Sequence, residues 1–292
     1  MNNRKPMTTL KLRKMKQEGT PITMITAYDY PSAKLADEAG MDMILVGDSL
    51  GNVVLGYDST LPVTLEDMIY HSRPVNRAVS SSFVVTDMPF LTYHGSLDST
   101  LFNVGRIIRE GGSKAVKMEG GREIAKTVEA VVNAGVPVVG HVGLTPQSVH
   151  QLGGYRVQGK NSEQIRKLFD DVIALEQAGA FAIVLELVTD DIAAEISSKV
   201  NVPTIGIGSG SSCDGQVLVF HDLLQYGSEV APKRFVKTYA DIGAQIRQAI
   251  STYGEEVRSR QFPAKEHAFQ SSKEQSGSKP TTQEESTSLY GN

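Results

Sequence analysis

Four acidic residues each close a short apolar run, and their positions are the first chemical signal in the sequence. The runs ILVGD, FVVTD, AVKME and AIVLE end in Asp48, Asp87, Glu119 and Glu186. If these runs are parallel strands of a barrel, their carboxyl ends open onto one face and the four carboxylates converge. Clustered carboxylates raise one another's pKa unless a positive charge lies among them. A divalent cation supplies that charge, and oxygen ligands without a Cys/His cluster favour Mg²⁺ first and Mn²⁺ second.

Each acid also has a structural interpretation, because Asp and Ser are favoured at helix N-caps. That alternative competes well for any single acid and is much weaker for all four together. Gly47 and Gly51 stand on either side of Asp48 and Ser49. Glycine lets a backbone and a ligand approach closely, so this segment fits a ligand site.

Three further polar side chains are expected on the same rim. Lys117 lies two positions before Glu119, hence on the same side of that strand, where it would bind a substrate carboxylate or an enolate oxygen. The alternative for this lysine is a structural ion pair with Asp87 or Glu119. His141 ends another strand and is placed to donate a hydrogen bond to a substrate, although an isolated histidine is more often structural. Tyr28 follows the first strand and is a candidate for the pocket wall.

The elements that must position these residues are short apolar runs that alternate with longer segments of helical periodicity. Helical segments such as REIAKTVEAVVNAG close on Ala-Gly, and glycine is typical of a helix C-terminus. Strands this apolar, separated by helices, indicate βα units around a parallel sheet. We expect an α/β fold, a (β/α)8 TIM barrel, with a doubly wound sheet as the alternative. The expected strands are 22–26, 43–47, 83–87, 115–119, 136–142, 180–187, 203–208 and, with the weakest pattern, 216–220.

Composition excludes several classes of partner. The chain has 292 residues and a net charge of −4, so a broad basic surface for nucleic acid is not expected. Its single cysteine, Cys213, cannot form an internal disulfide and fits a reducing cytoplasm. The polar, basic N-terminus does not resemble a secretory signal, and no apolar run approaches the ~20 residues of a membrane-spanning helix. We therefore expect a soluble cytoplasmic protein with no membrane partner.

Two segments carry weaker signals. Residues 271–292 are rich in Ser, Thr, Gln and Glu, which predicts a disordered tail after a single catalytic domain over residues 1–270. The glycine-rich run IGIGSG, at 205–210, resembles a phosphate cradle, but the chain has no G-x-x-x-x-G-K-[ST] pattern. The alternative is a turn with room for a bulky cosubstrate.

These residues together suggest a reaction. A Mg²⁺ ion held by carboxylates is suited to chelating a small 2-oxo acid and to stabilising the enolate formed when its α-proton is removed. A carboxylate that the metal does not need, Glu186, is then the candidate base. The hypothesis from the residues alone is carbon–carbon bond chemistry through a metal-bound enolate.

Several motifs resemble those of the ketopantoate hydroxymethyltransferase family, in order from about residue 8 to residue 267. They are TAYDYPSAKLADEAG, MILVGDSLGNVVLGYDSTLPVTLEDM, VVTDMPF, VKMEGG, GHVGLTPQSV, GGYRVQGK, VLELV and IGIGSG. The resemblance implies a phosphoenolpyruvate-mutase-like (β/α)8 barrel assembled as a homo-oligomer, commonly a decamer. It also implies transfer of a hydroxymethyl group from methylenetetrahydrofolate to 3-methyl-2-oxobutanoate, giving 2-dehydropantoate and tetrahydrofolate at the start of pantothenate synthesis.

The family's functional residues fall on the acids and polar groups already named. Its metal ligands fall on Asp48, Asp87 and Glu119, and its catalytic base falls on Glu186. Its substrate contacts fall on Asp48, Ser49, Asp87 and Lys117, with His141 nearby. The run GSGSSCDGQ departs from the family's usual IGAG-like turn, and the tail lies outside the family pattern; neither touches the proposed chemistry.

Two other functions remain open from sequence. One is a C–C lyase or mutase of the same barrel type acting on another 2-oxo acid; those relatives place a cysteine-containing loop near the metal, whereas Cys213 lies outside the carboxylate motifs. The other is a metal-dependent binding barrel without turnover, because fold alone does not fix function.

Overall fold

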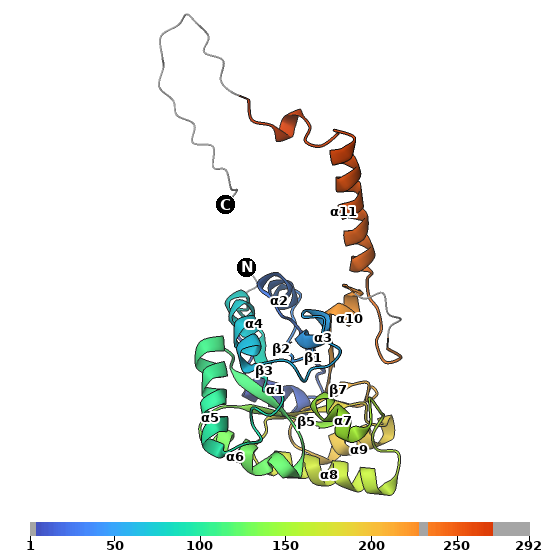
Figure 1. Cartoon of the computed structure of the whole chain (residues 1–292). Coiled ribbons are helices and arrows are strands. Elements are labelled where there is room, and N and C mark those ends of the chain that lie inside the picture. Colours follow the sequence, from blue (N-terminus) through green and yellow to red (C-terminus); the bar gives the residue numbers. More distant parts are fainter. Residues whose placement is uncertain (1–3, 228–232, 271–292) are drawn as a thin grey trace, which may run out of the picture. The chain divides into compact units, whose positions relative to one another are not determined.

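Eight parallel strands close into a barrel in chain order, which confirms the predicted (β/α)8 fold and excludes the doubly wound sheet (Figure 1). The ring closes between the first and last strands, where Ile22 lies opposite Gly215. The strands are β1 (Ile22–Thr26), β2 (Met43–Val46), β3 (Phe83–Asp87), β4 (Ala115–Glu119), β5 (Val138–Gly143), β6 (Ala182–Glu186), β7 (Thr204–Ile207) and β8 (Gly215–Leu218).

The computed structural model describes residues 4–227 and 233–270 of the chain. The chain divides into two compact units, Met1–Gly243 and Ala244–Asn292, and the barrel belongs to the first. The second unit therefore begins inside the segment that the sequence assigns to one domain, and the boundary at residue 270 stays a prediction. The predicted tail, 271–292, lies outside the described residues.

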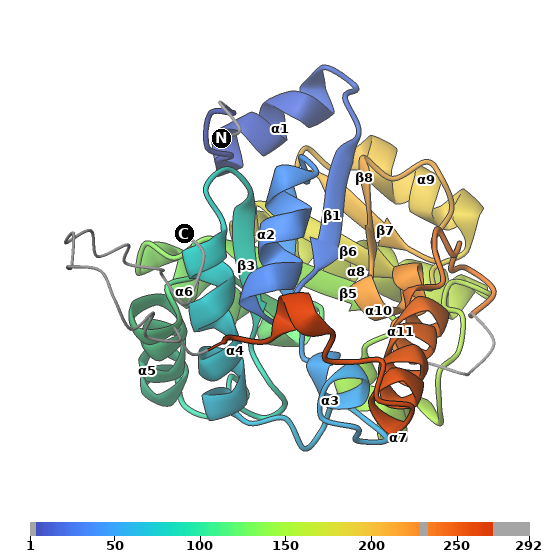
Figure 2. The ribbon, with the colours of Figure 1, turned by 90° about the horizontal axis from the view of Figure 1, so that it is seen from above.

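Helices flank the strands on the outside of the barrel (Figure 2). Their starts follow capping rules: Thr64 and Asp67 form a capping box at the start of the helix that begins at Leu65. In the first unit the helices and helical turns are α1 (Thr9–Gln17), α2 (Tyr30–Glu38), α3 (Leu50–Val53), α4 (Leu65–Ala78), α5 (Leu97–Arg106), η1 (Ile107–Gly111), η2 (Arg122–Ile124), α6 (Ala125–Asn133), η3 (Pro146–Ser148), α7 (Val149–Leu152), α8 (Ser162–Gln177), α9 (Asp190–Lys199) and α10 (Phe220–Leu224). They are followed by α11 (Ile242–Arg258) and η4 (Lys265–His267).

None of the helices within residues 4–227 and 233–270 is both long enough and apolar enough to span a membrane.

Strand alternation separates two apolar layers and fixes which side chains face the barrel interior. In β2, Met43 and Leu45 belong to the cluster inside the barrel, whereas Ile44 and Val46 belong to the layer between strands and helices. Successive side chains of a strand point to opposite faces, so every second residue after an inner one also points inward. By this rule the polar residues at the strand ends that face inward are Thr26, Asp87, Lys117, Glu119, His141 and Glu186.

Candidate active site

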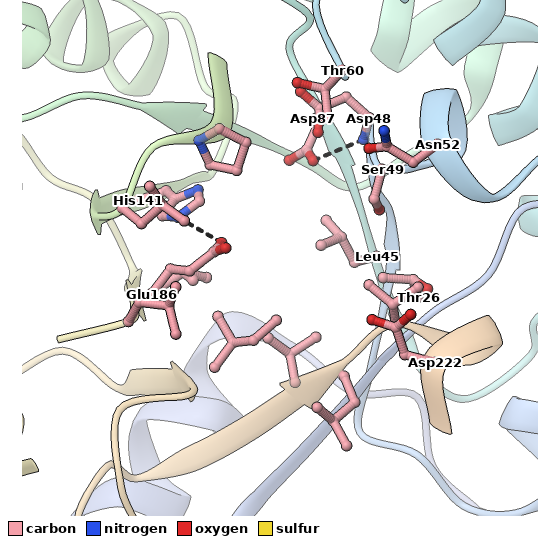
Figure 3. Close-up of a pocket in the computed structure, with 18 of the residues that line it drawn as sticks. Thr26, Leu45, Asp48, Ser49, Asn52, Thr60, Asp87, His141, Glu186 and Asp222 are labelled. Atoms are coloured by element: carbon pink, nitrogen blue, oxygen red, sulfur yellow. Dashed lines mark hydrogen bonds and ion pairs between the residues drawn. The ribbon is translucent and has the colours of Figure 1, made fainter. Parts of the chain in front are cut away.

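A cavity of about 540 Å³ opens at the carboxyl ends of the strands, within the volume range of small-molecule sites. Figure 3 shows His141 and Glu186 on one side of it, with Asp48, Asp87 and Ser49 facing them at the top and Thr26 with Asp222 facing them farther down. Seven of the eight residues singled out by sequence line this cavity: Asp48, Ser49, Asp87, Lys117, Glu119, His141 and Glu186.

Three of the acids meet at its buried end, from the ends of three consecutive strands. The backbone N–H of Asp48 donates to Asp87 Oδ2 at 3.0 Å, which fixes the turn after β2 against the end of β3 (Figure 3). Lys117 Nζ lies 2.9 Å from Asp87 Oδ1 and 3.9 Å from Glu119 Oε1. We call Asp48, Asp87 and Glu119 the acid cluster; with Lys117 it contains three carboxylates and one ammonium group, all buried.

His141 connects the acid cluster to the fourth acid. Its Nδ1 lies 3.1 Å from Lys117 Nζ and 3.4 Å from Glu119 Oε1. Its Nε2 lies 3.2 Å from Glu186 Oε2, on the same side of the cavity (Figure 3). Glu186 is more accessible than the cluster, with 17% of its side chain exposed against 3% for Glu119. Glu186 is thus the acid that can reach a bound ligand with least obstruction.

The N-cap alternative does not hold for any of the four acids. The N-cap residue of α3, after Asp48, is Ser49, whose side chain makes no capping hydrogen bond. The N-cap residue of α9, after Glu186, is Thr189, and that of η2, after Glu119, is Gly121. The N-cap residue of α5 is Ser96, nine positions after Asp87. None of the four acids therefore serves as a helix N-cap.

Burial and mutual repulsion set the charge state of the acid cluster. Burial raises the pKa of Asp48 well above its usual range, and the charges of Asp87 and Glu119 raise it further. Burial also raises the pKa of Asp87, against the lowering effect of Lys117. The pKa of Glu119 falls below its usual value, because His141 and Lys117 outweigh its burial. One lysine thus compensates only part of the negative charge.

His141 responds to the same charges. Burial and the nearby Lys117 act to lower the pKa of His141, but Glu119 and Glu186 overcome them and raise it to about 9. The pKa of Lys117 also rises: burial opposes its charge, and Asp87, Glu119 and Asp48 outweigh that burial. Both cations therefore depend on the carboxylates around them.

The carboxylate oxygens of the acid cluster are the type of ligand that suits a hard divalent cation, although their positions do not yet form a coordination site. Among residues 4–227 and 233–270, no three His, Cys, Asp or Glu side chains lie close enough to hold a metal ion as they stand. Lys117 Nζ lies within 3.9 Å of two of the acids, Asp87 and Glu119. Asp87 Oδ1 is buried without a hydrogen bond of good geometry, although its distance to Lys117 is that of an ion pair. Carboxylate oxygens with such unsatisfied valence are the ligands that Mg²⁺ prefers.

Tyr28, the eighth predicted residue, does not line the cavity, so the expectation that it forms part of the pocket wall is corrected. Strand β1 ends at Thr26, which takes the lining position, and the chain then turns toward α2. Tyr28 lies behind Ser49, and its hydroxyl is 2.9 Å from Ser49 Oγ. Its ring packs against His221, with 5.5 Å between ring centroids.

The glycine-rich run at 205–210 has a packing reason. Gly208 and Gly210 have φ values of +67° and +80°, which disfavour other residues. A Cβ on Gly208 would lie 2.6 Å from Leu187 Cδ2, and one on Gly210 would overlap the Asp190 carboxylate. The run therefore ends β7 and continues as a tight turn against the segment that follows Glu186; the room for a bulky cosubstrate that the alternative interpretation expected stays a prediction.

Sequence reasoning missed two residues that contact the acid cluster directly. Gln147 donates to Asp48 Oδ2 at 2.8 Å, and Tyr93 hydrogen-bonds the backbone of Glu119. Both lie on connections after strands, where side-chain direction follows no period. The only available signal was that Gln147 belongs to the motif GLTPQS.

Comparison with solved structures supports the fold. A phosphonopyruvate hydrolase in complex with oxalate and Mg²⁺ matches with a TM-score of 0.57 and 15% identity, over 89% of this chain and 93% of that chain. A 2,3-dimethylmalate lyase of the PEP mutase/isocitrate lyase superfamily matches with a TM-score of 0.56 and 18% identity, over 90% and 93%. At this identity the likeness concerns the barrel alone.

Comparison of sequences is more specific. The family model of ketopantoate hydroxymethyltransferase matches residues 6–265. A 3-methyl-2-oxobutanoate hydroxymethyltransferase of Thermoanaerobacter pseudethanolicus is 57% identical over 90% of this chain and 96% of its own length. The enzyme of that name from Bacillus cereus is 55% identical over 95% and 96%. The resemblance noted from the motifs is thereby confirmed: the chain belongs to the ketopantoate hydroxymethyltransferase family.

Proposed function

We propose that this protein transfers a hydroxymethyl group from methylenetetrahydrofolate to 3-methyl-2-oxobutanoate, giving 2-dehydropantoate and tetrahydrofolate in pantothenate biosynthesis. The supporting observation is Glu186, an accessible carboxylate that faces a cavity beside three buried acids. The overall change forms one C–C bond at C3 of the 2-oxo acid, replaces its C3–H, and consumes one water for the hydroxyl group. Family membership makes this reaction the leading candidate.

In this proposal Asp48, Asp87 and Glu119 hold Mg²⁺. When bound, Mg²⁺ supplies Lewis acidity to the oxo and carboxylate oxygens of the substrate and stabilises the negative charge that develops there. The acids supply the compensating charge: with Glu186 four carboxylates face two cations, Lys117 and His141, and this excess of acids favours a further positive charge. Mn²⁺ is the natural substitute in the same oxygen ligand set.

Glu186 acts as the base. The C3 proton of the 2-oxo acid moves to its carboxylate, and the electron pair of that C–H bond becomes available for attack on the one-carbon unit. His141, 3.2 Å from Glu186 Oε2, orients that carboxylate toward the cavity. Ser49 and Lys117 line the same end and would bind the substrate's carboxylate and oxo group.

The remaining volume suits a second, larger substrate. A five-carbon 2-oxo acid fills only part of a cavity of about 540 Å³. Opposite Glu186, Asp222 lies beside Thr26 (Figure 3), and the neighbouring strands β7 and β8 contribute the apolar side chains Ile207, Val217 and Leu218 to the lining. We assign this half to the folate cosubstrate, whose flat ring needs apolar walls and a few polar contacts.

Exchange of the C3 proton tests the base and the metal together. The measurement is NMR of 3-methyl-2-oxobutanoate in deuterated water with Mg²⁺ and without folate. Wild type should exchange this proton; Glu186→Gln should bind Mg²⁺ normally and exchange about 10²- to 10⁴-fold more slowly. Asp48→Ala should lose both Mg²⁺ binding and exchange.

The outcomes separate the alternatives. Near-normal exchange in Glu186→Gln would remove Glu186 from the role of base. If wild type itself does not exchange the proton, the full reaction with methylenetetrahydrofolate decides between a folate-dependent deprotonation and a different 2-oxo acid. A lyase or mutase would instead consume an oxaloacetate- or isocitrate-like acid; the cysteine-containing loop expected near the metal of such an enzyme has no counterpart here, because Cys213 does not line the cavity.

A further inference from the structure

Gln147 and Tyr93 are uncharged side chains that contact the acid cluster from outside the cavity's charged wall. They are 5% and 1% exposed, respectively. Gln147 lies in η3, after β5, and Tyr93 lies between β3 and α5. Neither side chain is explained by core packing alone, because each carries polar atoms that burial would penalise without hydrogen bonds.

Gln147 holds two of the three acids at once. Its side-chain Nε2 donates to Asp48 Oδ2 at 2.8 Å and to the carbonyl oxygen of Met88 at 2.9 Å. Its backbone N–H donates to Glu119 Oε2 at 3.0 Å. One residue therefore bridges the carboxylates that follow β2 and β4.

Tyr93 fixes the direction of the Gln147 amide. The Tyr93 hydroxyl lies 2.8 Å from Gln147 Oε1 and 2.9 Å from the carbonyl oxygen of Glu119, and it accepts from the Glu119 N–H at 3.1 Å. Reversing the amide would place Gln147 Oε1 against Asp48 and the Met88 carbonyl, so that acceptors would face one another. The neighbours thus select one orientation, in which both Nε2 hydrogens are used.

A neutral amide has a particular use beside clustered carboxylates. A lysine or arginine in its place would hold Asp48 equally well but would cancel negative charge that a cation needs. An amide fixes one oxygen of the carboxylate and leaves the net charge of the cluster unchanged. We propose that Gln147 and Tyr93 are positioning residues that hold Asp48 and Glu119 in place for a divalent cation, an inference that rests on the proposed cation site.

The test is the affinity for Mn²⁺, measured by electron paramagnetic resonance titration of the full-length protein. Gln147→Leu removes both amide donors with little change in size, and Tyr93→Phe removes only the hydroxyl. Loss of such outer partners typically weakens metal binding about 10- to 100-fold, so Gln147→Leu should fall in this range and Tyr93→Phe should shift in the same direction. Raising Mg²⁺ should restore proton exchange in both variants, which purely structural damage would not allow.

Asn76 supplies a matched control. Its side-chain amide donates to the Ser72 carbonyl, the Gly111 carbonyl and Ser113 Oγ at 2.9, 3.0 and 3.1 Å, and it does not line the cavity. Asn76→Leu removes an equally satisfied amide and should lower stability while leaving Mn²⁺ affinity at the wild-type value.

Each outcome has a definite reading. Folded variants of Gln147 and Tyr93 with wild-type Mn²⁺ affinity overturn this inference and leave the proposed function intact. A wild type that binds no Mn²⁺ overturns the cation site and the inference with it. If Gln147→Leu does not fold, Tyr93→Phe decides alone, because its ring packing is preserved.

Discussion

At the scale of residues, the main feature of the cavity is that its four predicted acids outnumber the two cations beside them, Lys117 and His141. Lys117 is within 3.9 Å of two carboxylates and 3.1 Å from His141. A lysine so placed either balances the acids or exchanges one of them for the carboxylate of a substrate. The two roles predict different effects of its removal.

Lys117→Ala should mainly weaken binding of the 2-oxo acid. A hydrogen bond between charged groups contributes about 1.5–3 kcal/mol, so the dissociation constant should rise about tenfold or more. Calorimetric titration with 3-methyl-2-oxobutanoate at saturating Mg²⁺ measures it. Lys114→Ala is the control: this lysine lies three positions earlier, is exposed, and its Nζ lies 3.4 Å from the Ser82 carbonyl oxygen. Unchanged affinity in Lys117→Ala would instead assign this lysine to a structural ion pair with Asp87.

Strand alternation predicts the direction of a site residue only where that residue belongs to a strand. Asp87 and Glu186 share the inward parity of the apolar residues two positions before them, and Glu119 shares that of Ala115, four positions before it. Tyr28 and Gln147 follow strands, and the direction of a connection depends on contacts made elsewhere in the chain. Sequence therefore placed Tyr28 one layer too far inward and did not assign Gln147.

At the scale of elements, Glu186 is held by the strand on either side of it and by the turn that follows. Leu187 has a φ of +47°, in a region that side chains with a Cβ rarely adopt, immediately after the proposed base. The Leu144 N–H donates to the Glu186 carbonyl at 2.8 Å. Gly143 precedes Leu144 and lies opposite Glu186 in the register of β5 with β6; its φ is +95°.

Gly143→Ala should reduce activity while the barrel remains folded. A Cβ at this position would overlap the Glu186 carbonyl oxygen and lie 2.8 Å from Val188 Cγ2, so the end of β6 must move. We expect a loss of proton exchange of about tenfold or more, since misplacement of about 1 Å can cost ~10²-fold. Gly135→Ala is the control: its φ is +90°, with no heavy atom within 4 Å of the added Cβ. Equal activity of the two variants would contradict this role for Gly143.

A second element-scale feature links α2 to the start of β3. Asp37, 3% exposed, accepts hydrogen bonds from the backbone N–H groups of Ser80, Ser81 and Ser82 and from the hydroxyls of Ser80 and Ser82. Burial acts to raise the pKa of Asp37, but the hydrogen bonds from Ser80 and Ser82 outweigh it and lower the pKa to about 2. The ionised carboxylate is thus the stable partner of this turn.

This arrangement predicts a specific sensitivity to acid. Because the folded-state pKa is depressed, the stabilisation is fully present above the ordinary value of 3.8 and is lost as the pH falls toward 2. The difference corresponds to about 2 kcal/mol at neutral pH. Ser82→Ala should reduce the loss of stability between about pH 5 and pH 3, measured by urea unfolding. Ser81→Ala, whose hydroxyl does not contact Asp37, should keep the wild-type slope; identical slopes in both would refute the assignment.

At the scale of the whole molecule, eight alternations of strand and helix were enough to predict the closed barrel. The division into two units was not predicted, because the periodicity of α11 resembles that of any barrel helix. Taken by itself, α11 shows one apolar stripe: Ile246, Ile250, Tyr253 and Val257, of which Ile250 is 65% and Tyr253 57% exposed. Exposed apolar stripes of this kind mark surfaces that bind protein.

The stripe leads to a prediction about assembly, in line with the homo-oligomer, commonly a decamer, that the motif resemblance implied. Ile250→Asp should lower the molar mass measured by light scattering, without loss of helical circular dichroism. Gln248→Asp, on an exposed part of the same helix, is the control. A wild type that is already monomeric would contradict the expected homo-oligomer.

The cavity described here is unequal around its circumference. At the strand ends its charged groups come from β3 to β6 and the turn after β2, whereas β7 and β8 contribute Ile207, Val217 and Leu218; Asp222 and Lys233 line it from farther along the chain. A molecule that fills the whole cavity must therefore have the same asymmetry, with a compact anionic group at one end and a flat apolar ring system at the other. An inhibitor that mimics only the 2-oxo acid would compete for the crowded polar end, and joining such a head to an aromatic scaffold would exploit both halves in one compound.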